Sequence, residues 1–449
     1  MYLRNVEVAG KYVHVRIAGV TIDGIGADLR PGPADDVVDG GGGALLPGLH
    51  DHHLHLLAMA AARASVPVGP PQVSQPAQFG AALREAHRRQ PPGEWIRAIG
   101  YHESVAGDLD RRTLDAVVAD RPVRVQHRSG AMWVVNSAAA TAVGLDPSHD
   151  GRLFRMDGWL RDRVPSDGRL DLGAVARQLA GYGITGVTDA TPFEDAGGFG
   201  LLAGAGLPLD VVVTGGPALA AASVPEPLGR GPVKIVVPDH EPMPFDDLTG
   251  AIQTAHRADR PVAVHCVTRV SLALLVAAFD QTGTRLGDRV EHGAVVPPDL
   301  AQRLAESGVT VVTQPSFVRE RGDQYLDEVD ADDRRWLYPC RSLLAAGVPV
   351  GGSSDAPFAN ADPWPAIATA ANRRTAAGRV LGQEETVSAE RALALYLSAP
   401  EQPGGPSRRL AVGGPADLCL LDRPLADALA EPSADHVVMT IRAGQVTHQ

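Results

Sequence analysis

Lysine is almost absent from this sequence of 449 residues. Lysine and arginine together number 41, but lysine occurs only at Lys11 and Lys234, and the other basic residues are arginines. The guanidinium group of arginine stays protonated, whereas the amine of a lysine can lose its proton when it is buried. Lys234, in an apolar run, is therefore a candidate for chemistry that arginine cannot perform.

Cysteine, long apolar runs and excess positive charge are also lacking. Cys266, Cys340 and Cys419 have no metal-motif spacing and are best interpreted as small buried residues in a reducing cytoplasm. No signal peptide is visible in the first ten residues, and no apolar run is long enough to span a bilayer. The net charge of −12 argues against nucleic acid or an anionic membrane as partner. We expect a cytoplasmic protein that acts on a small molecule, with homo-oligomerisation left open.

The two ends of the chain differ from its middle in their pattern of apolar and polar residues. Residues 1–46 and 402–449 contain short alternating apolar and polar segments with glycine turns, which are typical of β-strands. Residues 47–401 instead alternate short apolar runs with helical stretches. Such alternation indicates parallel strands with crossover helices. We expect an α/β protein, a (β/α)8 TIM-like barrel over 47–401 with a small β-sandwich formed from both chain ends.

The expected barrel strands are short and rich in β-branched residues. Helices are expected after them, for example over Val270–Phe279 and Asp332–Ala346. The strands are expected in WIRAIGY, PVRVQH, GITGVTDA, LDVVVTGG, VKIVV, PVAVHC, RVEHG, VTVVTQP and VPVGGSSD.

The strongest local signal is the histidine-rich segment PGLHDHHLH, residues 47–55. Alternate residues of a strand share a face, so Asp51, His53 and His55 point the same way. Two imidazoles on one face can hold one metal ion, and Asp51 can hydrogen-bond a ligand histidine from behind. An isolated H-x-H is weak evidence by itself, since a polar surface turn has the same composition.

Three further polar residues close expected strands downstream. His265 ends PVAVH, His292 ends RVEH, and Asp355 ends VPVGGSSD. The carboxyl ends of barrel strands converge on one mouth, so residues far apart in sequence can meet there. A lone strand-end histidine is more often structural than catalytic, but three such residues together with H-x-H are hard to explain as packing.

The chain resembles the amidohydrolase superfamily over nearly its whole length. PGLHDHHLH resembles the PGxxDxHxH opening of that superfamily. The segments VKIVVPD, VAVHC, RVEHG, TQPSF and GVPVGGSSDAPFANADPW are similar to the branch that contains N-substituted formamide deformylases, amidohydrolase family 3. The resemblance implies that His53, His55 and Asp355 bind one divalent metal and that His265 and His292 bind a second.

The resemblance also implies that Lys234 is the carboxylated lysine that bridges two metals, with Zn²⁺ the expected ion. A carbamate forms only on a neutral amine, and arginine does not provide one. This requirement would explain why position 234 has a lysine in a chain whose other basic residues are almost all arginines. Lys234 lies early in its strand, however, so Asp239, His240 or Glu241 at the strand end remain alternative ligands.

The chain departs from the branch near the expected pocket. Relatives often read H-x-x-G-D at the fifth-strand histidine, where this chain has Thr268 followed by Arg269. Gly130 is followed by alanine instead of histidine, and the lysine strand lacks its Asp-Gly. Substrate contacts are therefore assigned only as candidates, namely Tyr101, Arg128 and Trp133, with Arg128 able to clamp a carboxylate.

The expected activity is hydrolysis of a C–N bond in an amide, an N-acyl or N-formyl compound or a cyclic amide, by metal-activated water. Asp355 would take the water's proton and pass it to the leaving nitrogen. One alternative is a mononuclear deaminase of a nitrogen heterocycle. That reaction calls for an acid at position 268, where this chain has threonine, or from His102, His127 or Glu241 on another strand. The other alternative is a metal-free barrel that serves as a binding or scaffold protein.

Overall fold

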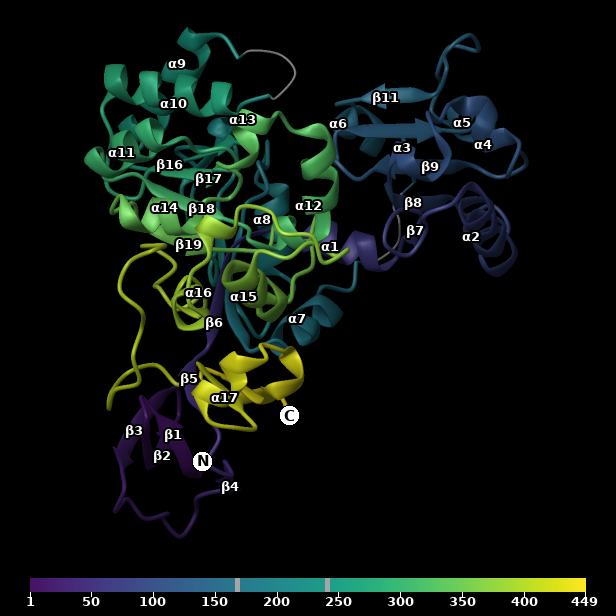
Figure 1. Ribbon diagram of the computed structural model, residues 1–449. Coiled ribbons are helices and arrows are strands. Elements are labelled where there is room, and N and C mark those ends of the chain that lie inside the picture. The colour runs from purple at the N-terminus through teal and green to yellow at the C-terminus, as the bar shows by residue number, and fades with distance from the viewer. Residues whose placement is uncertain (166–169, 239–242) are drawn as a thin grey trace. The chain divides into compact units, whose positions relative to one another are not determined.

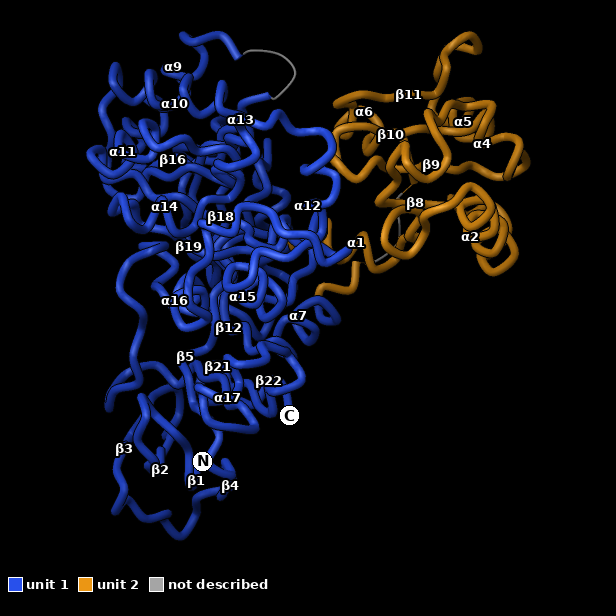
Figure 2. The backbone as a smooth tube through the Cα atoms, viewed as in Figure 1, with its two compact units in different colours: residues 1–55, 173–449 blue, residues 56–172 orange. Residues whose placement is uncertain are grey.

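The computed structural model describes residues 1–165, 170–238 and 243–449. The chain divides into two compact units (Figure 2). Unit 1 consists of residues 1–55 and 173–449, and unit 2 of residues 56–172. Asp239, His240 and Glu241, the alternative ligands named above, lie outside the described residues.

Two parallel sheets form the centre of unit 1 (Figure 1). One has four strands in the order β14-β13-β12-β6, and the other has five in the order β15-β16-β17-β18-β19. Their bounds are β6 Leu49–Leu54, β12 Ile184–Asp189, β13 Asp210–Val213, β14 Gly229–Arg230, β15 Val233–Val236, β16 Val262–Cys266, β17 Arg289–His292, β18 Thr310–Thr313 and β19 Val350–Gly352. The strands expected from GITGVTDA, LDVVVTGG, VKIVV and the later segments are therefore present.

Hydrogen bonds join the two sheets at both of their ends. The backbone N–H of Lys234 on β15 donates to the carbonyl of Gly215 beyond β13, at 2.8 Å. At the other side, the N–H of Asp355 donates to the carbonyl of His53 at 2.8 Å, and that of His55 donates to Ala356 at 2.9 Å. The segment after β19 is thereby fixed against the carboxyl end of β6.

Most helices of unit 1 follow these strands and bury one face. On α9 the side chains of Leu248, Ile252 and Ala255 recur at helical spacing and are fully buried. The bounds are α7 Leu172–Ala180, α8 Gly197–Ala203, α9 Phe245–Arg257, α10 Arg269–Thr282, α11 Pro298–Glu306, α12 Ser316–Glu328, α13 Ala331–Arg334, α14 Cys340–Ala345, α15 Pro363–Asn372, α16 Ala389–Ala394 and α17 Leu425–Ala430.

The single helix expected over Asp332–Ala346 is wrong, because α13 and α14 occupy that segment as two short helices. Pro339 lies between them at the N-cap of α14. Proline lacks the N–H that a continuous helix needs and disfavours helical backbone in the residue before it. The helix expected over Val270–Phe279 is present as α10.

The two chain ends form two further four-stranded sheets, ordered β3-β2-β1-β4 and β22-β21-β20-β5. Side chains from both sheets, among them Leu3, Val15, Leu418 and Ile441, belong to one buried hydrophobic cluster. The bounds are β1 Tyr2–Val8, β2 Lys11–Ala18, β3 Thr21–Gly26, β4 Val37–Asp39, β5 Leu45–Pro47, β20 Leu418–Leu421, β21 Val437–Arg442 and β22 Gln445–His448.

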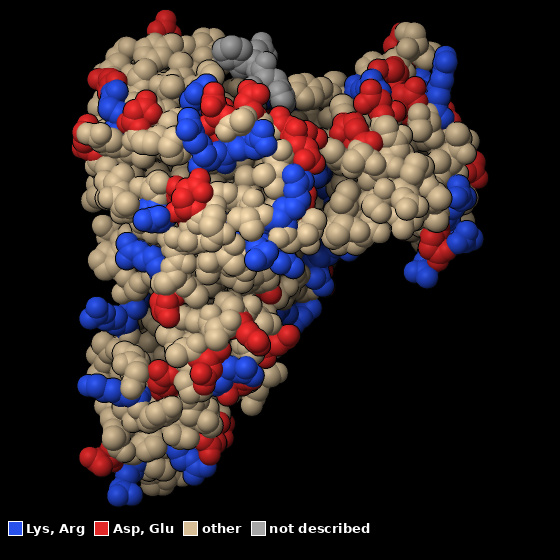
Figure 3. All heavy atoms as spheres, viewed as in Figure 1, with Lys and Arg blue, Asp and Glu red and all other residues tan. Residues whose placement is uncertain are grey.

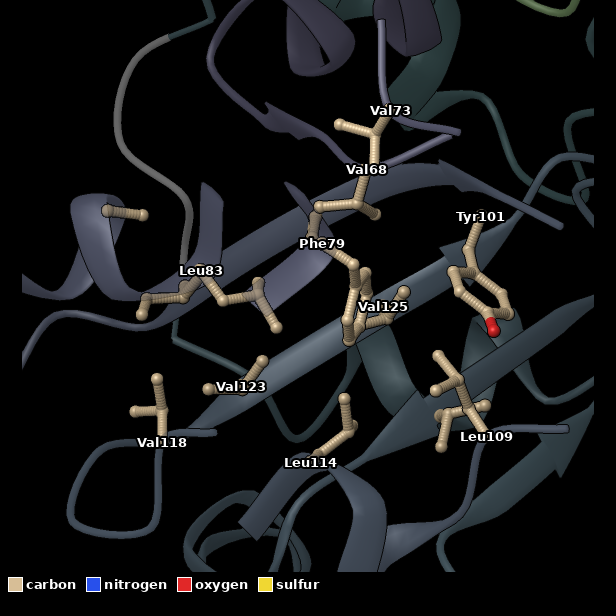
Figure 4. Close-up of a cluster of buried hydrophobic side chains, with 14 of the residues drawn as sticks. Val68, Val73, Phe79, Leu83, Tyr101, Leu109, Leu114, Val118, Val123 and Val125 are labelled. Atoms are coloured by element: carbon tan, nitrogen blue, oxygen red, sulfur yellow. The ribbon is translucent and has the colours of Figure 1, made fainter. Parts of the chain in front are cut away.

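Unit 2 has a five-stranded sheet of its own, in the order β11-β10-β9-β8-β7. Its core is drawn in Figure 4, where Phe79 and Leu83 of α2 lie over Val123 and Val125 of β9. The bounds are α1 Leu56–Arg63, β7 Val66–Pro67, α2 Pro76–Arg89, β8 Ile96–Tyr101, α3 Glu103–Ala106, α4 Arg111–Asp115, β9 Val123–His127, β10 Met132–Val135, α5 Ser137–Ala142, β11 Arg152–Phe154 and α6 Asp157–Arg161.

This sheet corrects one expectation about the central strands. WIRAIGY and PVRVQH do form parallel strands, β8 and β9, but these pair with each other and with β7 and β10. They do not join the two sheets of unit 1. The pattern of a buried strand predicted the strand correctly but not the sheet to which it belongs.

Charged side chains are spread over the surface. On the face shown in Figure 3 acidic and basic residues are interspersed, so the net charge of −12 is not gathered into one acidic area of that face. Among the residues that the structure describes, no helix is both long and apolar enough to cross a membrane.

Arg260 contributes to the junction between the two parallel sheets. Its side chain is 1% exposed and donates to the carbonyls of Gly231, Leu219 and Pro232, each at 3.0 Å, and to that of Thr214. These carbonyls belong to the segments between β13 and β15. A guanidinium group suits this task because it presents five donors in a fixed plane.

We predict that Arg260→Met lowers the free energy of unfolding by about 3 kcal/mol, because several buried carbonyls lose a side-chain donor. Urea denaturation measures the change. Arg257→Met is the matched control, since Arg257 is exposed at the end of α9 and bonds only Thr254 among the described contacts. Equal stabilities of the two variants would contradict this role for Arg260.

Candidate metal centre

The first part of the centre is the carboxyl end of β6. All six residues of this strand are buried, because the strand lies inside unit 1 with β12 paired along one edge. His53 is 1% exposed, and His55 follows the strand directly. Their ring centroids are 5.3 Å apart in an edge-on arrangement. The H-x-H spacing therefore places both imidazoles on one side, as the strand periodicity predicts.

Asp355 lies against both of these histidines. Its Oδ1 is 3.1 Å from His55 Nε2 and 3.5 Å from His53 Nε2. One ligand atom from each of the three side chains lies within 4.8 Å of the others, which makes this group a possible metal site. Asp355 also has a φ of 59°, in the left-handed region that residues other than glycine rarely adopt. Such backbone conformations concentrate at functional sites.

Asp51 connects the strand end to the segment that carries Asp355. Its Oδ1 accepts the backbone N–H of His53 at 3.0 Å and that of Ser354 at 3.2 Å. Burial raises the pKa of Asp51 to about 7, although these hydrogen bonds act to lower it. Asp51 is therefore placed to position the neighbouring residues through their backbone, behind the two histidines.

His265 and His292 extend the cluster from the neighbouring sheet. His265 is the penultimate residue of β16, and His292 is the last residue of the adjacent parallel strand β17; their ring centroids are 4.6 Å apart. The ring of His292 is also 4.8 Å from that of His53. His292 Nδ1 contacts Gln314 Oε1 at 2.9 Å, which fixes the orientation of the ring. The histidines expected to meet at strand ends thus do meet.

The electrostatics of the cluster favour neutral imidazoles and an ionised carboxylate. Burial holds the pKa of His53 well below its usual value, and the positive charge of Lys234 lowers it further. Burial has the same effect on the pKa of His292. For Asp355 burial acts to raise the pKa, but the hydrogen bond with His55 and the nearby histidines lower it below its usual value. Neutral histidines and ionised carboxylates are the forms that bind metals.

Lys234 is buried within this group of charges. It is 3% exposed, and its Nζ makes no hydrogen bond with any residue that the structure describes. Burial lowers the pKa of Lys234, while the negative charges of Glu291 and Asp355 partly offset that effect. A buried amine without a partner is costly, so its environment in this structure is incomplete. An additional acidic or metal-bound group beside Nζ would complete it.

Glu291 is a residue of the centre that sequence analysis missed. It is fully buried and bonds His53 Nδ1 with one oxygen, while the other oxygen accepts from Arg289 Nε at 2.6 Å. His53 therefore has Nδ1 on a carboxylate and Nε2 toward Asp355, which is the usual arrangement of a ligand histidine. The sequence signal that could have indicated Glu291 is the spacing Arg289-x-Glu291 in an expected strand, because this spacing places two opposite charges on the same face of that strand.

The three candidate substrate contacts lie in unit 2. Tyr101 and Trp133 are 3% and 4% exposed, and both are engaged there. The hydroxyl of Tyr101 donates to Gly107, and Trp133 Nε1 donates to Asp157 at 2.7 Å. Arg128 donates its backbone N–H to the carbonyl of Tyr101 at 2.8 Å. The side chains of Tyr101 and Trp133 thus have structural roles within unit 2, and contact of all three residues with substrate stays a prediction.

Comparison with known proteins identifies the family. The sequence model described as the amidohydrolase family matches residues 36–448. The N-substituted formamide deformylase of Arthrobacter pascens is 25% identical over an alignment that covers 91% of this chain and 89% of that protein.

Two solved structures share the fold. An uncharacterized metal-dependent hydrolase from Pyrococcus horikoshii has a TM-score of 0.76 at 20% identity, covering 94% of this chain and 97% of that one. The zinc complex of atrazine chlorohydrolase from Arthrobacter aurescens has a TM-score of 0.59 at 16% identity, covering 100% of this chain and 95% of that one. The expected α/β fold and the expected enzyme class are confirmed. The chain belongs to the amidohydrolase family, a family of metal-dependent hydrolases.

Proposed function

We propose that this protein hydrolyses a C–N bond in an amide, an N-acyl or N-formyl compound or a cyclic amide of low molecular weight. The observation that carries the proposal is the convergence of His53, His55 and Asp355, with His265 and His292 beside them, at adjoining strand ends. The family membership supports a hydrolase. The name of the Arthrobacter relative supports an N-acylated substrate, although at 25% identity it does not specify one.

The residues fit one or two divalent transition-metal ions. Burial keeps the imidazoles of His53 and His292 neutral and the ionised Asp355 lies among them, while Lys234 Nζ lacks a partner among the described residues. Imidazole ligands favour Zn²⁺ and its neighbours over Mg²⁺ or Ca²⁺. We assign His53, His55 and Asp355 to one ion, and His265 and His292 to a second. A divalent ion bound there would polarise a substrate carbonyl and make water more acidic.

Lys234 is proposed to carry a carboxylate on Nζ, which would serve as a further ligand for the metal ions. The neutral amine adds to CO₂, forms the N–C bond and releases one proton, leaving a carbamate anion. Burial favours the neutral amine because it lowers the pKa of Lys234. The carbamate would also give the buried Nζ a polar environment, which the described residues do not provide.

Asp355 is proposed to move the proton. Its carboxylate is held by His55 and kept ionised at neutral pH, so it is ready to accept the proton of the attacking water. The same group then donates that proton to the leaving nitrogen, which departs as a neutral amine. Asp51 holds the backbone next to Asp355 in place during both transfers.

Position 268 favours amide hydrolysis over deamination of a heterocycle. Thr268 is the N-cap of α10, and its Oγ1 accepts the N–H of Ser271 at 3.0 Å in a capping box. A threonine engaged in this way supplies no acid for protonating a ring nitrogen. Of the other candidates for that acid, His102 and His127 lie in unit 2, and Glu241 is outside the described residues. A deaminase remains the second candidate function.

For the architecture, we propose that the two parallel sheets of unit 1 are parts of one (β/α)8 barrel, in which β14 and β15, separated only by Gly231 and Pro232, together form one of the eight strands. The hydrogen bonds from β15 to the end of β13, and from Asp355 to the end of β6, support closure. The shared hydrophobic cluster of the end sheets supports a β-sandwich made from residues 1–46 and 402–449. Within the proposed barrel segment 47–401, unit 2 is then an insertion after β6.

We predict that Glu291→Gln weakens metal binding by about 10- to 100-fold, because the ligand His53 loses an anionic partner on Nδ1. Competition with a chromogenic chelator measures the affinity. Glu385→Gln is the control, since Glu385 is equally buried but accepts from Ser342 instead of a histidine. If both variants bind metal as the parent protein does, Glu291 has no such role.

We predict that Lys234→Arg loses most bound metal and activity although the new side chain is also basic, because a guanidinium forms no carbamate. Elemental analysis of the parent protein should find one to two equivalents of a divalent transition metal. Lys11→Arg is the matched control, since Lys11 is exposed on β2 and the chain has no third lysine. Active parent protein without metal would refute the proposed function, and a fully active Lys234→Arg would refute only the carbamate.

We predict that Asp355→Asn retains the fold but lowers turnover by about 100-fold or more, the usual effect of losing a general base. Asparagine tolerates the left-handed backbone of this position, so the substitution is conservative. Asp362→Asn should keep its activity, because Asp362 caps α15 and asparagine caps equally well. Steady-state kinetics decide, and near-normal turnover of Asp355→Asn would remove it from the mechanism.

We predict that a substrate panel separates amide hydrolysis from deamination. N-formyl and N-acyl compounds should release an amine, and the rings of cyclic amides should be opened. Aminated purines, pyrimidines and triazines should release ammonia slowly or not at all. Amine and ammonia are measured separately. Rapid ammonia release from an aminated ring without amide cleavage would establish the second candidate function instead.

A further inference from the structure

The ring of His55 has a polar contact at each of its two nitrogens. Nε2 is 3.1 Å from Oδ1 of Asp355, on the side of the candidate metal centre. Nδ1, on the other edge of the ring, is 3.2 Å from the hydroxyl oxygen of Thr191. The side chain of His55 is 14% exposed, so water has limited access to it. Because hydrogen bonds are directional, the ring cannot turn without losing one of these two contacts.

Thr191 reaches His55 because two parallel strands run side by side. It lies two residues beyond the end of β12, the strand that pairs with β6. The pairing continues past both strand ends, since the N–H of Ala190 donates to the carbonyl of Leu54 at 2.8 Å. Leu54 and Ala190 directly precede His55 and Thr191 in the chain. The register of the two strands therefore brings the imidazole and the hydroxyl to the same edge of the sheet.

The segment that carries Thr191 is itself held by buried groups. Oδ1 of Asp189 accepts the N–H of Thr191 at 3.0 Å. Thr214, which follows β13, donates its hydroxyl to the carbonyls of Asp189 and Thr191, at 3.1 and 3.2 Å. The side chains of Asp189 and Thr214 are fully buried. These bonds fix the backbone of residues 189–191, so the hydroxyl of Thr191 has a defined place beside His55.

A hydroxyl group suits both tautomers of His55. When Nε2–H donates to Asp355, Nδ1 has the lone pair, and the hydroxyl of Thr191 donates to it. When Nε2 offers its lone pair to a metal ion, the proton lies on Nδ1, and the hydroxyl oxygen accepts it. A backbone N–H at this place could only donate and would oppose the second tautomer. Thr191 therefore stays a partner of His55 when the ring changes from one tautomer to the other.

We propose that Thr191 is a positioning residue of the metal centre, which orients His55 and supports the tautomer that binds metal through Nε2. The inference rests on the proposed function, because it takes His55 as a metal ligand. Ligand histidines usually have an outer hydrogen-bonding partner of this kind. His53 has the carboxylate of Glu291 at Nδ1, whereas His55 has a neutral hydroxyl there. A neutral acceptor raises the basicity of a ligand ring less than a carboxylate does, so the two histidines differ in donor strength.

Thr188 provides a matched comparison on the same strand. Its hydroxyl is 3.0 Å from Nε2 of His50, so it also joins β12 to a histidine of β6. Alternate residues of a strand share a face, which places His50 on the opposite face from His53 and His55. A threonine that only fastens the two strands together would act alike at both positions. A threonine that orients a metal ligand acts at position 191 alone.

The test measures the Kd of the full-length protein for Zn²⁺ by competition with a chromogenic chelator. Thr191→Val replaces the hydroxyl with a methyl group and should weaken binding about 10-fold, whereas Thr188→Val and Thr191→Ser should bind Zn²⁺ as the parent protein does. The visible absorption of the Co²⁺-loaded protein should change in Thr191→Val alone, because a ligand ring has lost its orientation. Parent-like affinity in Thr191→Val, or equal losses in Thr191→Val and Thr188→Val, would overturn the inference.

A second pair of variants keeps the test informative if Thr191→Val fails to fold. Thr191→Ser and Thr191→Ala both lack the methyl group of threonine and differ only in the hydroxyl. Thr191→Ala should therefore bind Zn²⁺ about 10-fold more weakly than Thr191→Ser. Equal affinities of these two variants would overturn the inference and leave the proposed function intact. An active parent protein that binds no metal would overturn both.

Discussion

The hydrogen bonds between the end of β6 and the segment after β19 are the contacts on which the candidate centre of unit 1 depends. They place Asp355 within 3.1 Å of His55, although 300 residues separate the two in sequence. Asp51 reinforces the contact by accepting N–H groups from both segments. Because bonds between backbone groups and a carboxylate fix distance and direction, contacts within the protein hold the candidate ligand atoms of His55 and Asp355 together.

The burial of so many polar groups constrains what the centre can be. His53, Glu291, Arg289 and Lys234 are each no more than 3% exposed. Arg289, Glu291 and His53 satisfy one another in a chain of hydrogen bonds. Lys234 does not find such a partner among the described residues, and an unpaired buried amine is destabilising. The described residues thus leave the buried Nζ of Lys234 without compensation, which sets this side chain apart from the paired residues around it.

The positions of most residues in this centre could be predicted from sequence, because they follow from the period of a strand and from the place where each strand ends. The period of two puts His53 and His55 on one face, and the convergence of strand ends brings His265, His292 and Asp355 toward them. Glu291 could not be predicted in the same way, since its partner His53 is 238 residues away and only the fold brings them together. The break between α13 and α14 was predictable from Pro339, but helical composition on both sides obscured it.

The assignment of strands to sheets is where sequence patterns fail in physical terms. An apolar run indicates that a strand is buried on both faces. It does not indicate which other strand pairs with it. β8 and β9, like β16 and β17, have a histidine at or next to their carboxyl ends, yet they pair within unit 2. The carboxyl end of a parallel pair collects polar residues in either sheet, because the chain leaves the sheet there. Histidines near adjacent strand ends therefore lie together in both units, as His265 and His292 do in unit 1 and as His102 and His127 do in unit 2.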